Sequence, residues 1–203
     1  MPKISEARRR AQQSTILDAA TRCFARNGFH RTSMADIVRE SKLSPGAIYC
    51  YFRGKHDIVA AIAAERHDRE SRMLAELPAS GSFAAGLRQL AQSLVVHFRD
   101  RREKQRRKVL IQIWSESLRD KQIRRIVERG LRQRDSLAAA LRHAQQAGEL
   151  TAAVDADSLS RVMLSLLQGL ILQQAWEPAL DVVSYFRTAA RLIETVLSTN
   201  QVV

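Results

Sequence analysis

Hydrophobic residues recur along most of this chain at the spacing of an α-helix, with polar residues between them. A half-buried strand would instead alternate apolar and polar residues at every second position. Residues 150–154 are too few and too rich in alanine to predict a strand. The pattern therefore predicts an all-α fold of about nine helices, over residues 9–27, 33–40, 44–52, 55–77, 83–99, 109–118, 120–146, 155–176 and 181–199.

The most specific local signals lie in residues 33–52. Ser33 is placed to cap a short helix, and Asp36 nearly completes a capping box three residues later. Ser44 is placed to cap a second short helix, with Pro45 in its first turn, where a missing N–H costs nothing. Two short helices joined by a tight turn are the arrangement of a protein that reads the major groove of DNA.

The second short helix is expected to present small and aromatic residues outward. Gly46 allows close approach of a partner surface to the backbone. Tyr49 and Tyr51 can donate hydrogen bonds to phosphate oxygens or pack against thymine methyl groups. The alternative is that the two tyrosines complete a core helix. The side chains expected to hold this helix to its neighbours are Leu43, Ile48 and Phe52.

Four segments taken together resemble the TetR family of transcriptional regulators. They are residues 24–29, 32–37 and 43–52, and Lys55. The resemblance implies a three-helix, helix-turn-helix DNA-binding head in residues 1–55, continued by a connecting helix from about residue 55 to 77. It also implies a helical domain in residues 56–203 that binds an effector and forms a dimer.

The resemblance assigns DNA contacts to individual residues. Thr32 and Ser33 would contact phosphate, and Lys55 would clamp a phosphate at the start of the next helix. Cys50 stands where a larger residue is frequent, which leaves base preference near it open, and Gly54 stands where a capping residue is common. Thiol sensing by Cys50 would require a lowered pKa that the sequence does not establish. The residues implied on the recognition helix are Ser44, Pro45, Gly46, Ala47, Tyr49 and Tyr51.

The charge distribution favours a polyanionic partner. The chain has 33 Lys and Arg against 21 Asp and Glu, a net charge of +12. Residues 1–55 carry 11 basic and 4 acidic side chains, and residues 56–203 carry 22 and 17. About a quarter of the chain thus holds more than half of the excess positive charge, which indicates a nucleic-acid-binding head.

Two basic stretches leave alternatives open. Residues 1–8 are expected to form a loose arm, and Lys3 and Arg8–Arg10 either reach DNA or remain solvated. Residues 99–108 contain seven basic and two acidic side chains. Such a run is usually a solvated helix end, although it would add a phosphate-facing patch if it folded toward the head.

The last two long helices carry more apolar surface than one buried face requires. Residues 162–171 and 182–196 are apolar on two sides. We therefore expect a homodimer whose two-fold interface is a four-helix bundle of these helices. The alternative is that both apolar faces belong to one large core.

Control of DNA binding implies a second site for a small-molecule effector. Aromatic and methionine side chains beside isolated polar groups suit an apolar pocket. Plain core packing is the alternative for each of them. The candidate pocket residues are Phe98, Trp114, Ser117, Met163, Gln168 and Trp176.

The sequence favours a regulator over two other classes of protein. No metal-ligand spacing, phosphate loop or nucleophile motif is present, so we expect no enzyme activity, metal or cofactor. A non-specific DNA-packaging protein is the main alternative. Two isolated cysteines, and the lack of a signal peptide or transmembrane run, predict a cytoplasmic protein. The function expected is a homodimeric repressor released from a palindromic operator by a small molecule.

Overall fold

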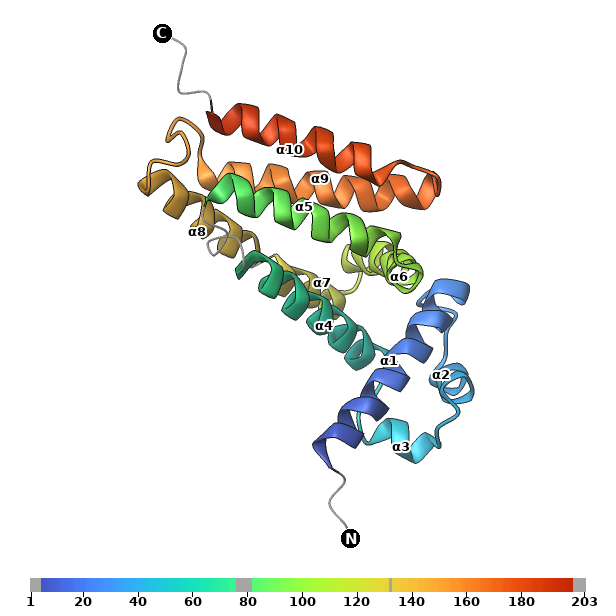
Figure 1. The fold of residues 1–203 in the computed structure, drawn as a ribbon. Helices are drawn as coiled ribbons and strands as arrows, with labels where there is room; N and C mark the ends of the chain where they lie inside the picture. Colours follow the sequence, from blue (N-terminus) through green and yellow to red (C-terminus); the bar gives the residue numbers. More distant parts are fainter. Residues whose placement is uncertain (1–4, 76–81, 132, 199–203) are drawn as a thin grey trace. The chain divides into compact units, whose positions relative to one another are not determined.

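The computed structural model describes residues 5–75, 82–131 and 133–198. Within these ranges the chain forms ten helices and no strand, which confirms the all-α class (Figure 1). The helices are α1 Glu6–Asn27, α2 Met34–Ser41, α3 Pro45–Tyr49, α4 Lys55–Ala75, α5 Phe83–Arg99, α6 Arg101–Ser117, α7 Lys121–Gly130, α8 Gln133–Gln146, α9 Ala156–Trp176 and α10 Val182–Ser198.

Some helix boundaries differ from those expected. The helix predicted over residues 120–146 is two helices, α7 and α8, and Gly130 is the last residue of α7. Glycine is among the poorest helix formers, which favours a break there. Helix α6 begins at Arg101 rather than near residue 109, because Arg, Lys and Glu form helices well without an apolar stripe. The ends predicted at residues 77 and 199 lie outside the described residues.

The chain packs as two compact units, and neither is a continuous segment. The head unit contains the residues up to Glu65 together with Lys104–Arg129. The body unit contains Arg66–Glu103 and the residues from Gly130 onward. Helices α6 and α7 therefore pack mainly with the head. The predicted division after residue 55 separates a DNA-binding part from a part that binds an effector and forms a dimer. That division of functions stays a prediction.

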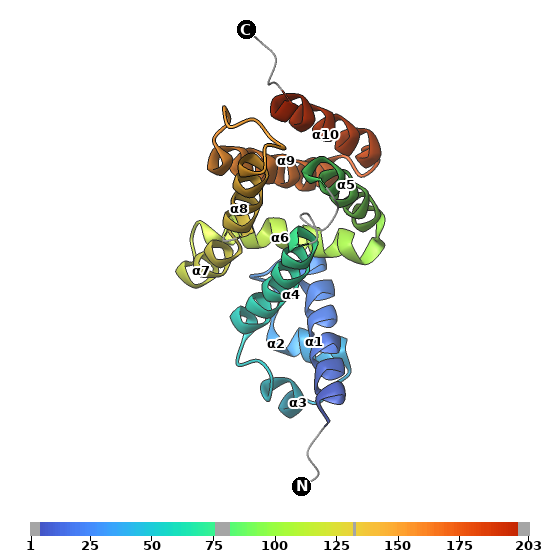
Figure 2. The ribbon, with the colours of Figure 1, turned by 60° about the vertical axis from the view of Figure 1, so that its left-hand side comes forward.

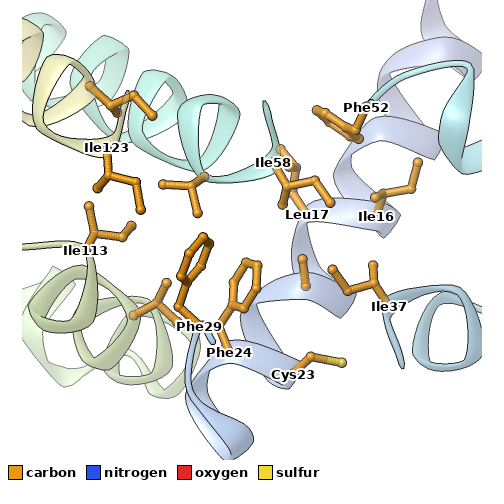
Figure 3. Packing of buried hydrophobic residues seen from close by; sticks show 14 of the residues in the cluster. Ile16, Leu17, Cys23, Phe24, Phe29, Ile37, Phe52, Ile58, Ile113 and Ile123 are labelled. Atoms are coloured by element: carbon orange, nitrogen blue, oxygen red, sulfur yellow. The ribbon is translucent and has the colours of Figure 1, made fainter. Parts of the chain in front are cut away.

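The core of the head unit is built from both parts of its sequence. Phe24 and Phe29 pack with their ring centroids 5.7 Å apart. Ile113 from α6 and Ile123 from α7 enter the same core, and Figure 3 shows all four side chains pointing into one interior. Burying a side chain of this kind stabilises the fold by roughly 1.5–3 kcal/mol. Residues far along the sequence thus fix the shape of the head.

The body unit has its own core, formed by α5, α8, α9 and α10. Helix α8 packs along α9, and α10 packs along α5, as can be followed in Figures 1 and 2. The hydroxyl of Tyr185 on α10 donates a hydrogen bond to the carbonyl of Leu166 on α9 at 2.8 Å. The fully or nearly fully buried residues of this core are Phe83, Leu87, Leu137, Leu141, Ala144, Leu150, Ala156, Leu159 and Ile193.

Candidate nucleic-acid interface and body cavity

The start of α2 is fixed by the capping box that the sequence predicted. Ser33 Oγ accepts the backbone N–H of Asp36 at 3.1 Å, and an Asp36 carboxylate oxygen accepts the N–H of Ser33 at 2.9 Å. These hydrogen bonds from Ser33 hold the pKa of the Asp36 carboxyl below its ordinary value. Lys42 ends α2 in the left-handed conformation, with φ of 59°. The turn between α2 and α3 is therefore held at both sides by local geometry.

Helix α3 is a short helix with an exposed outer face. Ser44 Oγ accepts the N–H of Ala47 at 3.2 Å and Pro45 occupies the first turn, as predicted. Tyr49 remains 53% exposed, whereas Ile48 between these residues is fully buried. A Cβ added at Gly46 would meet nothing within 4 Å, so the backbone there is open to a partner. The exposed residues of this face are Ser44, Pro45, Gly46 and Tyr49, with Ala47 half-buried beside them.

The expectation that Tyr51 points outward from the recognition helix is wrong. Helix α3 ends at Tyr49, and Tyr51 lies in the following turn, where its N–H donates to the carbonyl of Ile48 at 2.9 Å. The Tyr51 hydroxyl donates to Gln12 Oε1 at 2.8 Å, which ties the turn to α1. Tyr51 is half-buried as a result, and Tyr49 alone of the two tyrosines projects from α3.

Thr32 has a structural role in the head. The whole residue is 1% exposed, and its hydroxyl donates to the carbonyl of Gly28 at 2.7 Å. The phosphate contact of Thr32 stays a prediction. Ser33 is exposed, so its backbone and hydroxyl lie at the surface.

Lys55, the first residue of α4, contacts the loop between α1 and α2. Its ammonium group donates to the carbonyls of Phe29 at 2.7 Å and His30 at 3.2 Å, and it lies 4.6 Å from the centroid of the Phe29 ring. Partial burial lowers the pKa of the Lys55 ammonium group. An ammonium has three donors, so one remains for the predicted phosphate contact.

Some arginines of the head form salt bridges with carboxylates of the same unit. Arg22 and Arg26 both contact Glu40, at 2.7 Å and 3.1 Å, and their hydrogen bonds lower the pKa of the Glu40 carboxyl. Arg8 is exposed in the first turns of α1, so it belongs to a helix rather than to the loose arm expected, and Arg9 is exposed in the same helix, as predicted. Residues 1–4 of that arm lie outside the described residues. Lys42 and Arg53, on either side of α3, are also exposed.

Contacts between the N-terminal helices and α6–α7 were not anticipated from the sequence. His30 Nε2 lies 2.6 Å from Glu116 Oε2, and His56 Nε2 lies 2.7 Å from Asp120 Oδ2. Both pairs join residues more than 60 positions apart in the sequence, and no local motif signals them. They explain why α6 and α7 pack with the head.

The basic run at residues 99–108 is divided between structural and exposed positions. Arg106 contacts Asp18 at 3.3 Å and Glu65 at 3.9 Å, and Arg107 is buried. Lys104 and Lys108 are exposed on α6. Arg106 and Arg107 thus stabilise packing, whereas Arg99 and Arg102 are exposed like the two lysines, and a phosphate contact by the run stays a prediction.

A cavity of about 130 Å³ lies inside the body unit, lined almost entirely by apolar side chains. Met163 is the single effector candidate from the sequence that lines it. The described residues that line the cavity come from α4, α5, α8, α9 and α10. They are Glu70, Met73, Leu87, Leu90, Ala91, Leu94, Arg134, Leu137, Met163, Leu164, Leu166, Leu167, Tyr185, Phe186, Ala189, Ala190 and Ile193.

The other five effector candidates are not among the residues that line this cavity. Phe98 is buried and packs edge-on against the wall residue Phe186, with ring centroids 5.4 Å apart. Trp176 is 74% exposed at the end of α9, and Gln168 is half-buried without lining the cavity. Trp114 and Ser117 belong to the head unit, where the Ser117 hydroxyl donates to the Trp114 carbonyl at 2.7 Å.

The sequence pattern does not separate the wall residues of α9 and α10 from residues on the outer surface of the same helices, because both kinds of position are apolar. Leu166, Leu167 and Ile193 face the cavity. Other apolar residues of the same helices remain exposed, notably Val162 at 54% and Leu192 at 58%. The apolar residues of α9 and α10 that exceed one buried face therefore lie partly at the cavity wall and partly on the outer surface.

The two cysteines lie in different environments. Cys23 is buried in the head core, and burial raises the pKa of its thiol. Cys50 is exposed just after α3. Among the described residues, no cluster of three or more His, Cys, Asp or Glu side chains is arranged to hold a metal ion. No helix in this part of the chain has the length and apolar character needed to cross a membrane.

Comparison with known families accounts for most of the chain. Residues 16–62 match the family described as "Bacterial regulatory proteins, tetR family". Residues 83–198 match the family described as "BetI-type transcriptional repressor, C-terminal". The two matches cover the head helices α2 and α3 and the helices that enclose the cavity apart from α4.

Individual relatives are similar over most of their length. The HTH-type transcriptional regulator UidR of Escherichia coli K12 is 27% identical over 160 residues, which are 78% of this chain and 79% of UidR. The structure of Salmonella enterica GusR is 28% identical, with a TM-score of 0.79 over 97% of this chain and 99% of that one.

A third relative shares the fold at lower identity. The structure of the SmeT–triclosan complex is 22% identical, with a TM-score of 0.80 over 95% of both chains. The resemblance expected from residues 24–55 is thus confirmed. The chain belongs to the TetR family of helix-turn-helix transcriptional regulators, which are DNA-binding proteins and not enzymes, and it carries a BetI-type C-terminal domain.

Proposed function

We propose that the protein is a homodimeric repressor that binds a palindromic operator and leaves it when a small molecule enters the body cavity. The observation that carries the DNA-binding part is the outer face of α3. Ser44, Gly46 and Tyr49 are exposed beside a turn held by two helix caps. Small residues permit close approach to the floor of the major groove, and Tyr49 supplies a polar and apolar contact.

The dimer part rests on the outer surface of α9 and α10. Val162, Trp176, Leu192 and Val196 are large apolar side chains that are 44–74% exposed. Exposed apolar surface on adjacent elements marks an association surface. A two-fold dimer would present two copies of α3 about one DNA turn apart, roughly 34–36 Å, and hence select a palindrome.

The effector part rests on the cavity and on the continuity of α4. Glu70 and Met73 line the cavity from the second half of this helix, and Lys55 and His56 begin its first half in the head unit. A ligand that repositions the end of α4 therefore acts on the same helix that carries Lys55. A coupling of roughly 1–3 kcal/mol would change operator affinity about 5- to 150-fold. The structure of a SmeT–triclosan complex, which has a similar fold, supports a small-molecule site in this fold.

Selection of bound sequences from a random DNA pool tests the proposal. We expect the purified protein, at near-physiological salt, to enrich a two-fold symmetric sequence. A Tyr49→Ala variant should weaken binding to that sequence by roughly 1–3 kcal/mol while leaving the weak binding to random DNA nearly unchanged. Enrichment of no sequence, with salt-sensitive binding to any DNA, would contradict the proposal and favour a packaging protein.

A further inference from the structure

The polar groups at the cavity wall restrict which ligand chemistry it accepts. Among the described residues that line the cavity, the charged ones are Glu70 on α4 and Arg134 on α8. Tyr185 contributes a hydroxyl. The rest of the wall is formed by apolar side chains, so a ligand must bring a matching apolar body. Whether each polar group already has a hydrogen-bond partner in the protein then decides which charge the polar end of the ligand should carry.

Two of these three groups already have partners inside the protein. Glu70 accepts a hydrogen bond from Arg66 Nε at 2.5 Å, one helical turn away. Tyr185 donates its hydroxyl hydrogen to the carbonyl of Leu166 at 2.8 Å. A bound cation would have to compete with Arg66 for Glu70, and a bound acceptor would have to compete with Leu166 for Tyr185.

Arg134 differs from Glu70 and Tyr185 because its guanidinium makes no hydrogen bond of ordinary length to the carboxylate beside it. Its guanidinium approaches Asp135 at 3.7 Å, which is outside the range of a hydrogen bond. The Arg134 side chain is 25% exposed, whereas that of Asp135 is 64% exposed. A guanidinium presents five donors in a planar fork that matches a carboxylate. Arg134 also lies in the first turn of α8, where the helix dipole disfavours a cation and favours an anion.

Cavity size limits the apolar part of the ligand. A cavity of about 130 Å³ is close to the roughly 150 Å³ in which an apolar protein cavity binds benzene. The ligand body is then about one aromatic ring or a branched chain of similar size.

We infer that the cavity binds a small monocarboxylate with an aromatic or branched apolar body, and that Arg134 recognises its carboxylate. The inference rests on the cavity being the effector site proposed above, and it adds the chemical class of the effector. The apolar body would displace little or no water from the leucine-lined interior. The carboxylate would gain charge-assisted hydrogen bonds in a poorly hydrated site, where they are strongest.

Calorimetric titration of the protein without DNA tests this inference. The probes are three molecules that share one phenyl body: phenylacetate, 2-phenylethanol and 2-phenylethylamine. We expect phenylacetate to bind at least tenfold more tightly than the alcohol, and the amine to bind weakest. Arg134→Gln should weaken phenylacetate binding by roughly 10- to 100-fold and change alcohol binding less than about threefold.

Two further variants test whether the effect is specific to Arg134 and whether the probes bind inside the cavity. Arg142→Gln removes another arginine of α8 that contacts Asp157 at 2.7 Å and does not line the cavity, so phenylacetate binding should be unchanged. Ala189→Leu places extra volume into the cavity and should weaken all three probes together. The comparison of probes on the unaltered protein does not depend on any variant folding.

Each outcome decides the inference. Equal binding of acid and alcohol, tighter binding of the amine, binding of none of them, or phenylacetate binding that survives Arg134→Gln would overturn it. The result is separate from the operator selection. Phenylacetate binding that depends on Arg134, in a protein that selects no operator, would uphold the cavity chemistry and remove the proposed repressor function. Selection of an operator without such phenylacetate binding would uphold the proposed DNA-binding function and remove the cavity chemistry.

Discussion

The hydroxyl of Tyr51 donates a hydrogen bond to Gln12 Oε1, 2.8 Å away, and so joins the turn after the recognition helix to the helix that begins the chain. The two residues are 39 positions apart. This contact separates the roles of two tyrosines that look alike in the sequence. Tyr51 positions α3, whereas Tyr49 is free to face DNA.

Replacement of the two tyrosines should therefore have different consequences. Tyr51→Phe removes one hydrogen bond and should lower the free energy of unfolding by about 0.5–1.5 kcal/mol without changing the preferred DNA sequence. Tyr49→Phe keeps the exposed ring and should leave stability unchanged while altering operator affinity. Urea denaturation and operator titration of both variants provide the measurement. Altered sequence preference in Tyr51→Phe would show that Tyr51 also reads DNA.

Thr32 should act through stability rather than through its hydroxyl on phosphate. Thr32→Val keeps the shape of the side chain but removes its hydrogen bond to the partly buried Gly28 carbonyl, which should cost about 1–3 kcal/mol of unfolding free energy. Ser33→Ala, at the exposed neighbouring cap, should cost about 1 kcal/mol. At a temperature where Thr32→Val is fully folded, its salt dependence of DNA binding should equal that of the unaltered protein. A shallower salt dependence would assign the hydroxyl to a phosphate.

Acid should weaken the contact between α4 and the start of α7. The hydrogen bond from His56, together with the backbone N–H groups of Ile123 and Gln122, lowers the pKa of the Asp120 carboxyl from its ordinary 3.8. A carboxyl whose folded pKa is depressed contributes stability above its unfolded pKa, and this contribution is lost as the pH falls through the folded pKa. Asp120→Asn should thus be less stable than the unaltered protein near neutral pH, and the difference should shrink below about pH 3.8.

Urea unfolding midpoints measured near neutral pH and in acid check this expectation for Asp120. Asp157→Asn in the body unit serves as the control, because the Asp157 side chain is 60% exposed and has a single arginine contact. A stability difference for Asp120→Asn that does not change with pH would contradict the role assigned to its charge.

Gly130 is expected to resist substitution because of His67. A Cβ at Gly130 would lie 2.2 Å from His67 Nε2 and 2.6 Å from Cε1, so the imidazole would have to move. Gly130→Ala should lower the free energy of unfolding by about 1–3 kcal/mol. In a His67→Ala background the same change should be nearly neutral, and Gly169→Ala, which meets nothing within 4 Å, is the matched helix control. Equal costs of Gly130→Ala in both backgrounds would rule out the steric explanation.

The outer apolar residues of α10 should decide the oligomeric state. Leu192→Glu replaces an apolar side chain that is 58% exposed with a charged one, and it should convert the proposed dimer to a monomer. Val96→Glu on α5 is the control, because Val96 is 72% exposed outside α9 and α10. Sedimentation velocity distinguishes the two. A dimer that persists in Leu192→Glu would place the interface elsewhere.

The sequence by itself determined the helical class, the cap geometry of α2 and α3, and membership of the family. The helical class and the caps depend on residues three or four positions apart, where hydrogen bonding and helical period act without help from the rest of the fold. Family membership depends on the order and spacing of several such segments along residues 24–55. Ser33 with Asp36 and Ser44 with Ala47 are examples, and each forms the contact that its spacing predicted.

Only the tertiary structure decided where the remaining side chains point. Tyr51 turns inward because Gln12 is nearby in space, and Arg134 lines the cavity because five helices from separate parts of the chain meet there. The apolar pattern of α9 and α10 is the same for a residue that faces the cavity and for one that faces outward. Periodicity indicates that a position is apolar. Packing between distant segments of the chain then decides what the side chain at that position contacts.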